Sequence, residues 1–404
     1  MAHVLEISNH LRFNVQLAGH PLEHLHLGLI ETGLEKGLSL ALLGISAIPQ
    51  RAEACTGGAL TAADGSVVVG RTLEFGQPLD SQIAIWPAGS RFSGTSTSGA
   101  PLRYRSRYGF VGATAATHSD MLLDGLNEKG LNVGLFYFPG YAQYTPAAKA
   151  RSGRILAPAQ ISAWILANFA TTEEVKAQIG SIDLTPQVID LIGIVPDLHI
   201  KVQDASGRSI VIEPGGGRLV VHDNPTRVLT NAPTFDWHLT NLNNYVTLMR
   251  AYPAPKTIGA PGAGQLTLKP FGMGAGGAGL PGDFTPPSRF VRMVYFTQGA
   301  AQPANAEQAG FNLFHILNNF DIPYGVTQPP QGTSEADADY TTWTTVADLK
   351  NLRFSWRTYG DPQIKSLNLR QALAASGGQL RLLPMGPQRP TDRTAAQRVT
   401  VPVP

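Results

Sequence analysis

The sequence predicts an α+β fold in which antiparallel sheets pack against helices. Strand-like apolar segments come first along the chain, followed by helical segments, then by strands, helices and strands again. This order lacks the regular strand–helix alternation of a doubly wound fold. The 43 glycines and 30 prolines among 404 residues also indicate many turns and long loops rather than a helical bundle.

Two hairpins are predicted in the first third of the chain. Apolar runs flank the turn at 63–65, so Cys55 begins one strand while Arg71 and Glu74 lie near the end of its partner. A second polar turn at 127–130 precedes another apolar strand. These hairpins favour antiparallel sheets.

The later segments include both helices and strands. Apolar residues recur at helical spacing in 158–170, and Thr171 and Glu174 have the spacing of a capping box for the next helix. The Gly- and Pro-rich segment 251–286 has the length of a binding or assembly loop, and the tail 377–404 is expected to be flexible. Three strands are expected in 197–223, and two helices are expected in 288–320. A hairpin is expected in 340–359.

Composition argues against several classes of protein. The formal net charge is +2 without a run of Lys or Arg, so no nucleic-acid partner is expected. The single cysteine excludes an internal disulfide and a thiolate zinc site, and the histidines are scattered, so no metal is expected. The run 272–279 matches G-x-G-x-x-G but neither follows a strand nor opens a helix, so no dinucleotide cofactor is expected.

Residues 1–54 are predicted to be a leader that carries a signal peptide and is removed. The longest apolar run, 37–48, is too short for a membrane span and precedes Ala52-Glu53-Ala54, an A-x-A cleavage pattern. Cleavage after Ala54 would make Cys55 the first residue of a periplasmic or secreted protein. A buried helix is the alternative, because Arg51 and the long lead before the apolar run are unusual for a signal peptide.

An N-terminal cysteine carries a thiol and a free α-amine on one residue. Their ordinary pKa values are about 8.5 and about 7.7–8.0, so the amine can accept the thiol proton near neutral pH. This is the N-terminal variant of the nucleophile-and-base pair of covalent catalysis. Arg71 on the neighbouring strand would favour the thiolate of Cys55. Without cleavage, Cys55 is interpreted as a small buried hydrophobe.

Six motifs occur in order along the chain: CTGG, GRTLEF, NEKGL, YFPGYA, LTNAPTFDWH and PSRFVR. Together they make the sequence resemble the choloylglycine hydrolase family of N-terminal-nucleophile amidases, which includes bile salt hydrolases and penicillin V acylases. The resemblance spans residues 55–359. It implies a four-layer αββα sandwich, an amidase domain over 55–376, and hydrolysis of a linear amide C–N bond.

The resemblance implies a role for each matching residue. Cys55 matches the nucleophile and Arg71 the arginine beside the thiolate. Asn231 matches the side-chain donor of the oxyanion hole, and Tyr137 falls where the family supplies a backbone N–H to that hole. Arg289 matches the second active-site arginine. Fixed donors at a developing oxyanion are typically worth roughly 3–4 kcal/mol each.

Two positions depart from the common family pattern. Glu74 stands where the family commonly has an aspartate that holds the amine of the nucleophile, so an extra methylene must be accommodated. Tyr137 stands where bile salt hydrolases tend to have asparagine and penicillin V acylases tend to have tyrosine. The second departure favours a substrate other than a bile salt.

The expected substrate is a small N-acyl amide with a bulky apolar acyl group, cleaved through a thioester on Cys55. The resemblance also implies a homotetramer in which 251–286 extends onto a neighbour. Two other functions stay open: an N-acyl homoserine lactone acylase or other N-acyl amide hydrolase, and a secreted ligand-binding protein without activity. Three aromatic residues are expected to line the acyl pocket, with plain core packing as the alternative: Phe75, Phe136 and Phe138.

Overall fold

The described part of the chain is built around two large sheets. The structure is a computed structural model that describes residues 54–77, 79–116, 118–190, 193–328 and 338–388. The predicted signal-peptide segment lies outside the described residues. No helix in the described ranges is long and apolar enough to cross a membrane.

The strands of both sheets pair with their neighbours in antiparallel fashion. In spatial order, the first sheet contains β1 (Cys55–Thr61), β2 (Val67–Phe75), β16 (Tyr340–Asp348), β17 (Arg353–Thr358) and β18 (Asp361–Asn368). The second sheet contains β13 (Arg218–Asp223), β12 (Ser209–Gly215), β11 (Leu198–Gln203), β8 (Asn132–Tyr137), β7 (His118–Asn127), β6 (Phe110–Ala115), β3 (Gln82–Trp86) and β19 (Arg381–Pro384).

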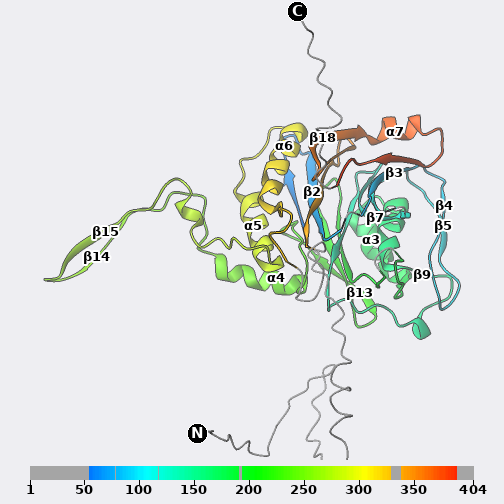
Figure 1. The fold of residues 1–404 in the computed structure, drawn as a ribbon, viewed down its shortest axis with the longest axis horizontal. Coiled ribbons are helices and arrows are strands. Elements are labelled where there is room, and N and C mark those ends of the chain that lie inside the picture. Colours follow the sequence, from blue (N-terminus) through cyan, green and yellow to red (C-terminus); the bar gives the residue numbers. More distant parts are fainter. Residues whose placement is uncertain (1–53, 78, 117, 191–192, 329–337, 389–404) are drawn as a thin grey trace, which may run out of the picture. The chain divides into compact units, whose positions relative to one another are not determined.

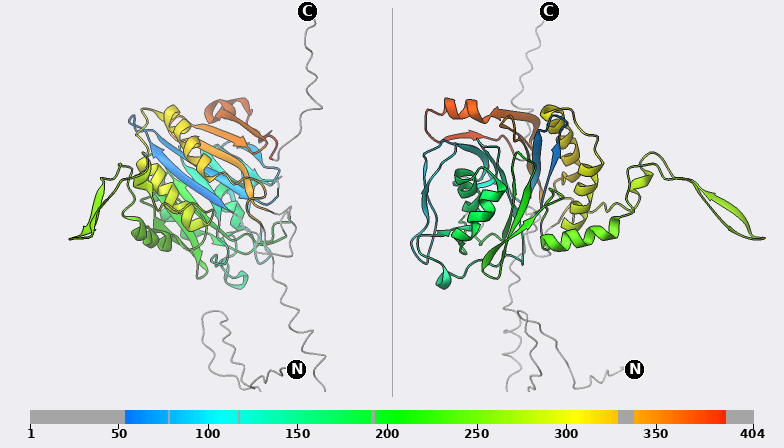
Figure 2. Two further views of the ribbon diagram at one scale, coloured as in Figure 1. Left: turned by 60° about the vertical axis from the view of Figure 1, so that its left-hand side comes forward. Right: turned by 180° about the vertical axis from the view of Figure 1, so that it is seen from behind.

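Helices cover the outer face of each sheet, so the layers run helix, sheet, sheet, helix (Figures 1 and 2). On one side, α5 (Pro286–Gly299) packs on β1, and α6 (Ala306–Leu317) packs on β1, β2 and β16. On the other side, α2 (Ile161–Asn168) packs on β7 and β8, and α3 (Thr172–Gln178) follows it. Between the sheets, β16 contacts β7. This arrangement confirms the predicted four-layer αββα sandwich.

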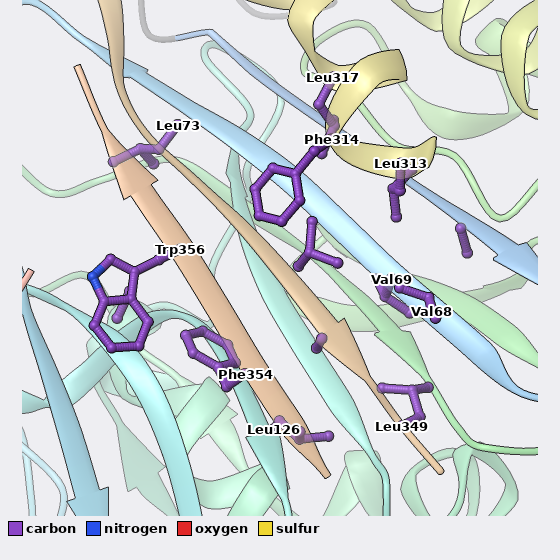
Figure 3. Packing of buried hydrophobic residues seen from close by; sticks show 14 of the residues in the cluster. Val68, Val69, Leu73, Leu126, Leu313, Phe314, Leu317, Leu349, Phe354 and Trp356 are labelled. Carbon is purple, nitrogen blue, oxygen red and sulfur yellow. The ribbon is translucent and has the colours of Figure 1, made fainter. Parts of the chain in front are cut away.

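Strand β2 is buried on both of its faces. Leu313 and Leu317 of α6 lie against Gly70, whereas the next residue, Arg71, points to the second sheet and bonds the Leu123 carbonyl. Figure 3 shows the two sides of this core, with Phe314 of α6 on one face of the sheet and Phe354 and Trp356 of β17 on the other. A strand covered on both faces shows a nearly continuous apolar run instead of alternation, as VVVGRTLEF does.

The predicted hairpins and helices are present. The turn at 63–65 joins β1 and β2, the turn at 127–130 joins β7 and β8, and β16 pairs with β17. The Thr171 hydroxyl accepts the Glu174 N–H at 3.2 Å, which caps α3 as the sequence predicted. Further elements are β4 (Arg91–Ser93), β5 (Arg103–Arg105), β9 (Ile155–Leu156), β10 (Asp183–Leu184), α4 (Phe235–Asn241) and α7 (Leu369–Ala375).

Two segments carry structure that the sequence did not indicate. The Gly- and Pro-rich segment 251–286 contains an exposed hairpin, β14 (Lys256–Ala260) and β15 (Gly264–Leu268), which projects from the sandwich (Figure 1). The glycines in this segment lack side chains, so the alternation of apolar and polar residues that indicates a strand is not visible there. The segment 377–388, expected to begin a flexible tail, contains β19, which pairs with β3. Four residues are too few to show a strand period.

Candidate active site

The Cys55 thiol lies directly beside the guanidinium of Arg71. Cys55 is the first residue of β1 and is buried, and Arg71 Nη2 donates to its Sγ at 2.8 Å. Arg71 is itself anchored to the second sheet, because its Nη1 donates to the carbonyl of Leu123 in β7 at 2.7 Å and to the carbonyl of Leu135 in β8. Its guanidinium also lies 4.3 Å from the centre of the Phe136 ring. The arginine is therefore fixed before any substrate binds.

Burial and charge act in opposite directions on the thiol. Burial raises the pKa of the Cys55 thiol, and the charge of Arg71 is the largest effect that opposes it. Arg289 and the backbone N–H of Tyr137 also lower this pKa, whereas Glu74 raises it. The surroundings therefore supply positive charge and a donor to a thiol that has little access to solvent.

Asn231 links Cys55 to Tyr137 and Arg289. Its Oδ1 accepts the Cys55 N–H at 2.8 Å and a bond from Arg289 Nη2 at 2.7 Å. Its Nδ2 donates to the Tyr137 carbonyl at 2.8 Å. A side-chain amide nitrogen carries two hydrogens, so Asn231 keeps a second donor hydrogen that is not used by Tyr137. The backbone N–H of Tyr137 hydrogen-bonds the Cys55 thiol, so both residues offer donors near Cys55.

Arg289 of α5 is buried and holds the start of β1. Its Nη1 donates to the Cys55 carbonyl and to Thr56 Oγ1, the latter at 2.8 Å, and its Nε donates to the Phe284 carbonyl at 2.8 Å. Burial lowers the pKa of its guanidinium, while Glu74 and Cys55 act against that effect. One side chain thus joins the first strand to the covering helix and to Asn231.

Glu74 lies on the helix-facing side of β2, because residues 71 and 74 point to opposite faces of a strand. Its Oε1 accepts from Thr341 at 2.9 Å, and its Oε2 has no hydrogen-bond partner among the described residues. Burial raises its pKa to about 7. The Cys55 N–H bonds Asn231 rather than Glu74, so the role of Glu74 in holding the amine stays a prediction.

The three aromatic residues expected at the acyl pocket are all buried. Phe136 lies under Arg71, and Phe138 stacks on His199 with the ring centres 4.3 Å apart. Phe75 lies opposite Tyr340 in the strand register. Phe136 therefore supports the arginine, and the contribution of the three rings to an acyl pocket stays a prediction.

Sequence reasoning missed several residues that hold this site. The Thr56 hydroxyl accepts a hydrogen bond from Arg289, and the Thr341 hydroxyl donates one to Glu74. His238 donates to the Asn231 carbonyl. Asp339 lies near Glu74 and Arg289, and burial together with the Glu74 charge raises its pKa to about 8. The only available signal was that Thr56 and His238 lie inside the motifs CTGG and LTNAPTFDWH.

The chain is similar to known proteins over most of its length. The family described as linear amide C-N hydrolases, choloylglycine hydrolase family, matches residues 55–376. A bile salt hydrolase/transferase of Clostridium perfringens (strain 13 / Type A) is 32% identical over 321 residues, which cover 78% of this chain and 93% of that protein. A penicillin V acylase of Pectobacterium atrosepticum is 28% identical, covering 80% of this chain and 83% of that protein.

The same similarity appears among solved structures. A variant of conjugated bile acid hydrolase from Clostridium perfringens superimposes with a TM-score of 0.72 at 29% sequence identity. The match covers 86% of this chain and 100% of that chain. The likeness therefore extends over the whole sandwich rather than one motif.

Proposed function

The chain belongs to the choloylglycine hydrolase family of linear amide C-N hydrolases, and on this premise we propose that Cys55 is an N-terminal nucleophile that cleaves a small N-acyl amide. The observation that carries the proposal is the 2.8 Å contact between Arg71 Nη2 and Cys55 Sγ. That contact supports a thiolate at the head of β1. Asn231 and Tyr137 beside it supply donors where the oxyanion would form.

The proposed reaction proceeds in two halves. The α-amine of Cys55 accepts the thiol proton, and the sulfur forms a bond to the amide carbonyl carbon. The second Asn231 hydrogen and the Tyr137 N–H hold the oxyanion. The C–N bond then breaks, the leaving amine takes the proton from the α-ammonium, and a thioester remains. Water next gives a proton to the α-amine and attacks the thioester, and the sulfur leaves with that proton as the acid is released.

This mechanism requires a cut after Ala54. Before the cut, the Cys55 nitrogen is an amide and cannot act as a base. We therefore propose that residues 1–54 are removed during export to the periplasm or the outside of the cell. Support comes from the apolar run 37–48 and the Ala52-Glu53-Ala54 pattern. Intact mass of the isolated protein tests this step, since a chain that begins at Met1 would rule out the mechanism.

The proposed substrate has an apolar acyl group. The names of the relatives point to conjugated bile salts and penicillin V, and Tyr137 favours the second. An N-acyl homoserine lactone or another N-acyl amide is the alternative. The test compares wild type with Cys55→Ser on penicillin V, glycocholate and a long-chain N-acyl homoserine lactone. Cleavage of any of them by wild type alone supports the proposal, and binding without cleavage of any supports a non-catalytic ligand-binding protein.

We also propose a homotetramer joined by the segment 251–286. Its hairpin is exposed throughout, and the loop after it presents Phe271 and Met273 with 98% and 88% of their surfaces accessible. Apolar side chains exposed to this extent are typical of an interface. Light scattering on wild type and on Phe271→Ser tests this. A monomeric wild type would contradict the proposal.

A further inference from the structure

Two buried histidines bond consecutive carbonyls of the loop that carries Asn231. His199 of β11 places Nε2 at 3.1 Å from the Thr230 carbonyl oxygen. His238 of α4 places Nε2 at 2.9 Å from the Asn231 carbonyl oxygen. Both side chains are completely buried. The loop is thus held by side chains from a strand and from a helix.

The contact of His238 defines where its proton lies. A carbonyl oxygen can only accept a hydrogen bond, so Nε2 of His238 carries the hydrogen and donates it. Nδ1 of the same ring is buried and has no hydrogen-bond partner in the part of the chain that the structure describes. His238 is therefore a neutral donor with a single fixed hydrogen bond, which it makes to Asn231.

Helix α5 holds Asn231 and His238 through two adjacent residues. Arg289 donates to the Asn231 side chain, as described above. The next residue, Phe290, stacks on the His238 ring with the centres 4.7 Å apart and the planes 15° apart. The side chain of Asn231 is consequently held by Arg289, and its backbone is held by His238, which the same helix orients.

We propose that His238 is a positioning residue of the active site, which acts through Asn231 by holding the backbone of that residue where its amide can donate to an oxyanion. The inference deepens the proposed function and rests on it. An oxyanion donor is effective only when it is already in place, because reorienting it during the reaction costs the stabilisation that it would supply.

Burial and the surrounding charges keep His238 neutral. Burial lowers the pKa of His238 to about 4, and the nearby His199 and Arg289 lower it as well. Its bond to Asn231 and the more distant Glu213 act in the opposite direction. His199 differs from His238 in having a partner at Nδ1. This nitrogen lies 3.2 Å from Glu213 Oε1, so a carboxylate orients the His199 ring.

The first test is independent of any substrate. In 15N-labelled protein, the ring nitrogens of His238 are expected to report the neutral form with the hydrogen on Nε2. The side-chain amide hydrogens of Asn231 are expected to exchange slowly in wild type and in His238→Gln, whose amide can donate from a similar position, and faster in His238→Leu. An Nδ1–H form of His238, or equal exchange in the three proteins, would overturn the inference even if no amide is cleaved.

The second test uses the amide that wild type cleaves. His238→Leu is expected to lower kcat by roughly 10- to 100-fold with KM changed less than threefold, since a displaced oxyanion donor affects the transition state more than substrate binding. His238→Gln should recover most of that loss. Phe92→Leu, in the separate core cluster beneath α2, is the control for reduced stability, with lower Tm and unchanged kcat. Equal losses in His238→Leu and His238→Gln, or a change in KM alone, would overturn the proposal.

Discussion

Arg71 and Cys55 lie on neighbouring strands two residues out of register, on the same face of the sheet. Cys55 pairs with Leu73, and Arg71 pairs with Gly57. The arginine therefore reaches diagonally along the hairpin to the sulfur at 2.8 Å. Because Gly57 has no side chain, the Phe136 ring occupies the space beside it and supports the guanidinium.

Removing the charge of Arg71 is expected to raise the pKa of the Cys55 thiol, because that charge is the largest effect opposing burial. Arg71→Met should therefore shift the pH profile of iodoacetamide alkylation to higher pH and reduce kcat/KM by about 100-fold. Arg71→Lys keeps the charge but cannot make all of the bonds of the guanidinium, so an intermediate effect is expected. Arg353→Met, at an exposed position, is the control. An unmoved alkylation profile in Arg71→Met would contradict this account.

A methyl group at Gly57 should disturb the support of Arg71. A Cβ at this position would lie 2.7 Å from the Phe136 ring, closer than real Cβ contacts allow. Gly57→Ala is expected to destabilise the protein by about 1–3 kcal/mol and to slow thiol alkylation, as measured by urea unfolding and by labelling. Adding Phe136→Leu should recover part of the stability. Gly282→Ala, where a Cβ meets nothing, is the control, and an equal effect there would refute the steric explanation.

Asn231→Asp separates the two sides of the asparagine amide. The carboxylate keeps an acceptor for the Cys55 N–H and Arg289 but loses the donor that faces Tyr137 and the oxyanion. We expect kcat to fall by roughly 10²- to 10³-fold, with a smaller change in KM. Steady-state kinetics on the cleaved amide measure this, with circular dichroism to verify folding. Wild-type kcat in a folded Asn231→Asp would exclude Asn231 as the oxyanion donor.

Glu74 should make stability depend on pH. Burial raises the pKa of its carboxyl from 4.5 to about 7. Between these values the unfolded chain loses a proton that the folded chain keeps, so this contribution is lost as pH rises towards 7. Glu74→Gln cannot ionise, so its free energy of unfolding should rise relative to that of wild type over this range, by up to about 3 kcal/mol. Its Tm should rise relative to that of wild type for the same reason. The exposed Glu307→Gln is the control, and parallel Tm curves for wild type and Glu74→Gln would contradict the shift.

Most of the fold could be predicted from the sequence because its hairpins are local. The turn at 63–65 and the apolar runs beside it determine β1 and β2, and the same holds for β7 and β8. The pattern failed where strands were short or rich in glycine, as in β19 and in the β14–β15 hairpin. A strand of four or five residues that packs against little shows no period to detect.

The site was predictable only in part. Cys55 and Arg71 are 16 residues apart in one hairpin, and the resemblance to a family named Asn231, Tyr137 and Arg289. Neither the hairpin nor the motifs indicated that the Cys55 N–H bonds Asn231 while Glu74 bonds Thr341. A single residue's position along a strand indicates its face, but its partner depends on what packs there.

The sequence by itself determined the family, the hairpin and the pairing of a thiol with an arginine, because these depend on motif order and on strand register. Only the tertiary structure decided how Asn231 and Arg289, 176 and 234 residues from Cys55, meet at the head of β1. Those contacts arise where helix α5 packs on the sheet and the loop after β13 closes beside it. Such contacts depend on packing between segments that are distant in the sequence, so local propensity does not predict them.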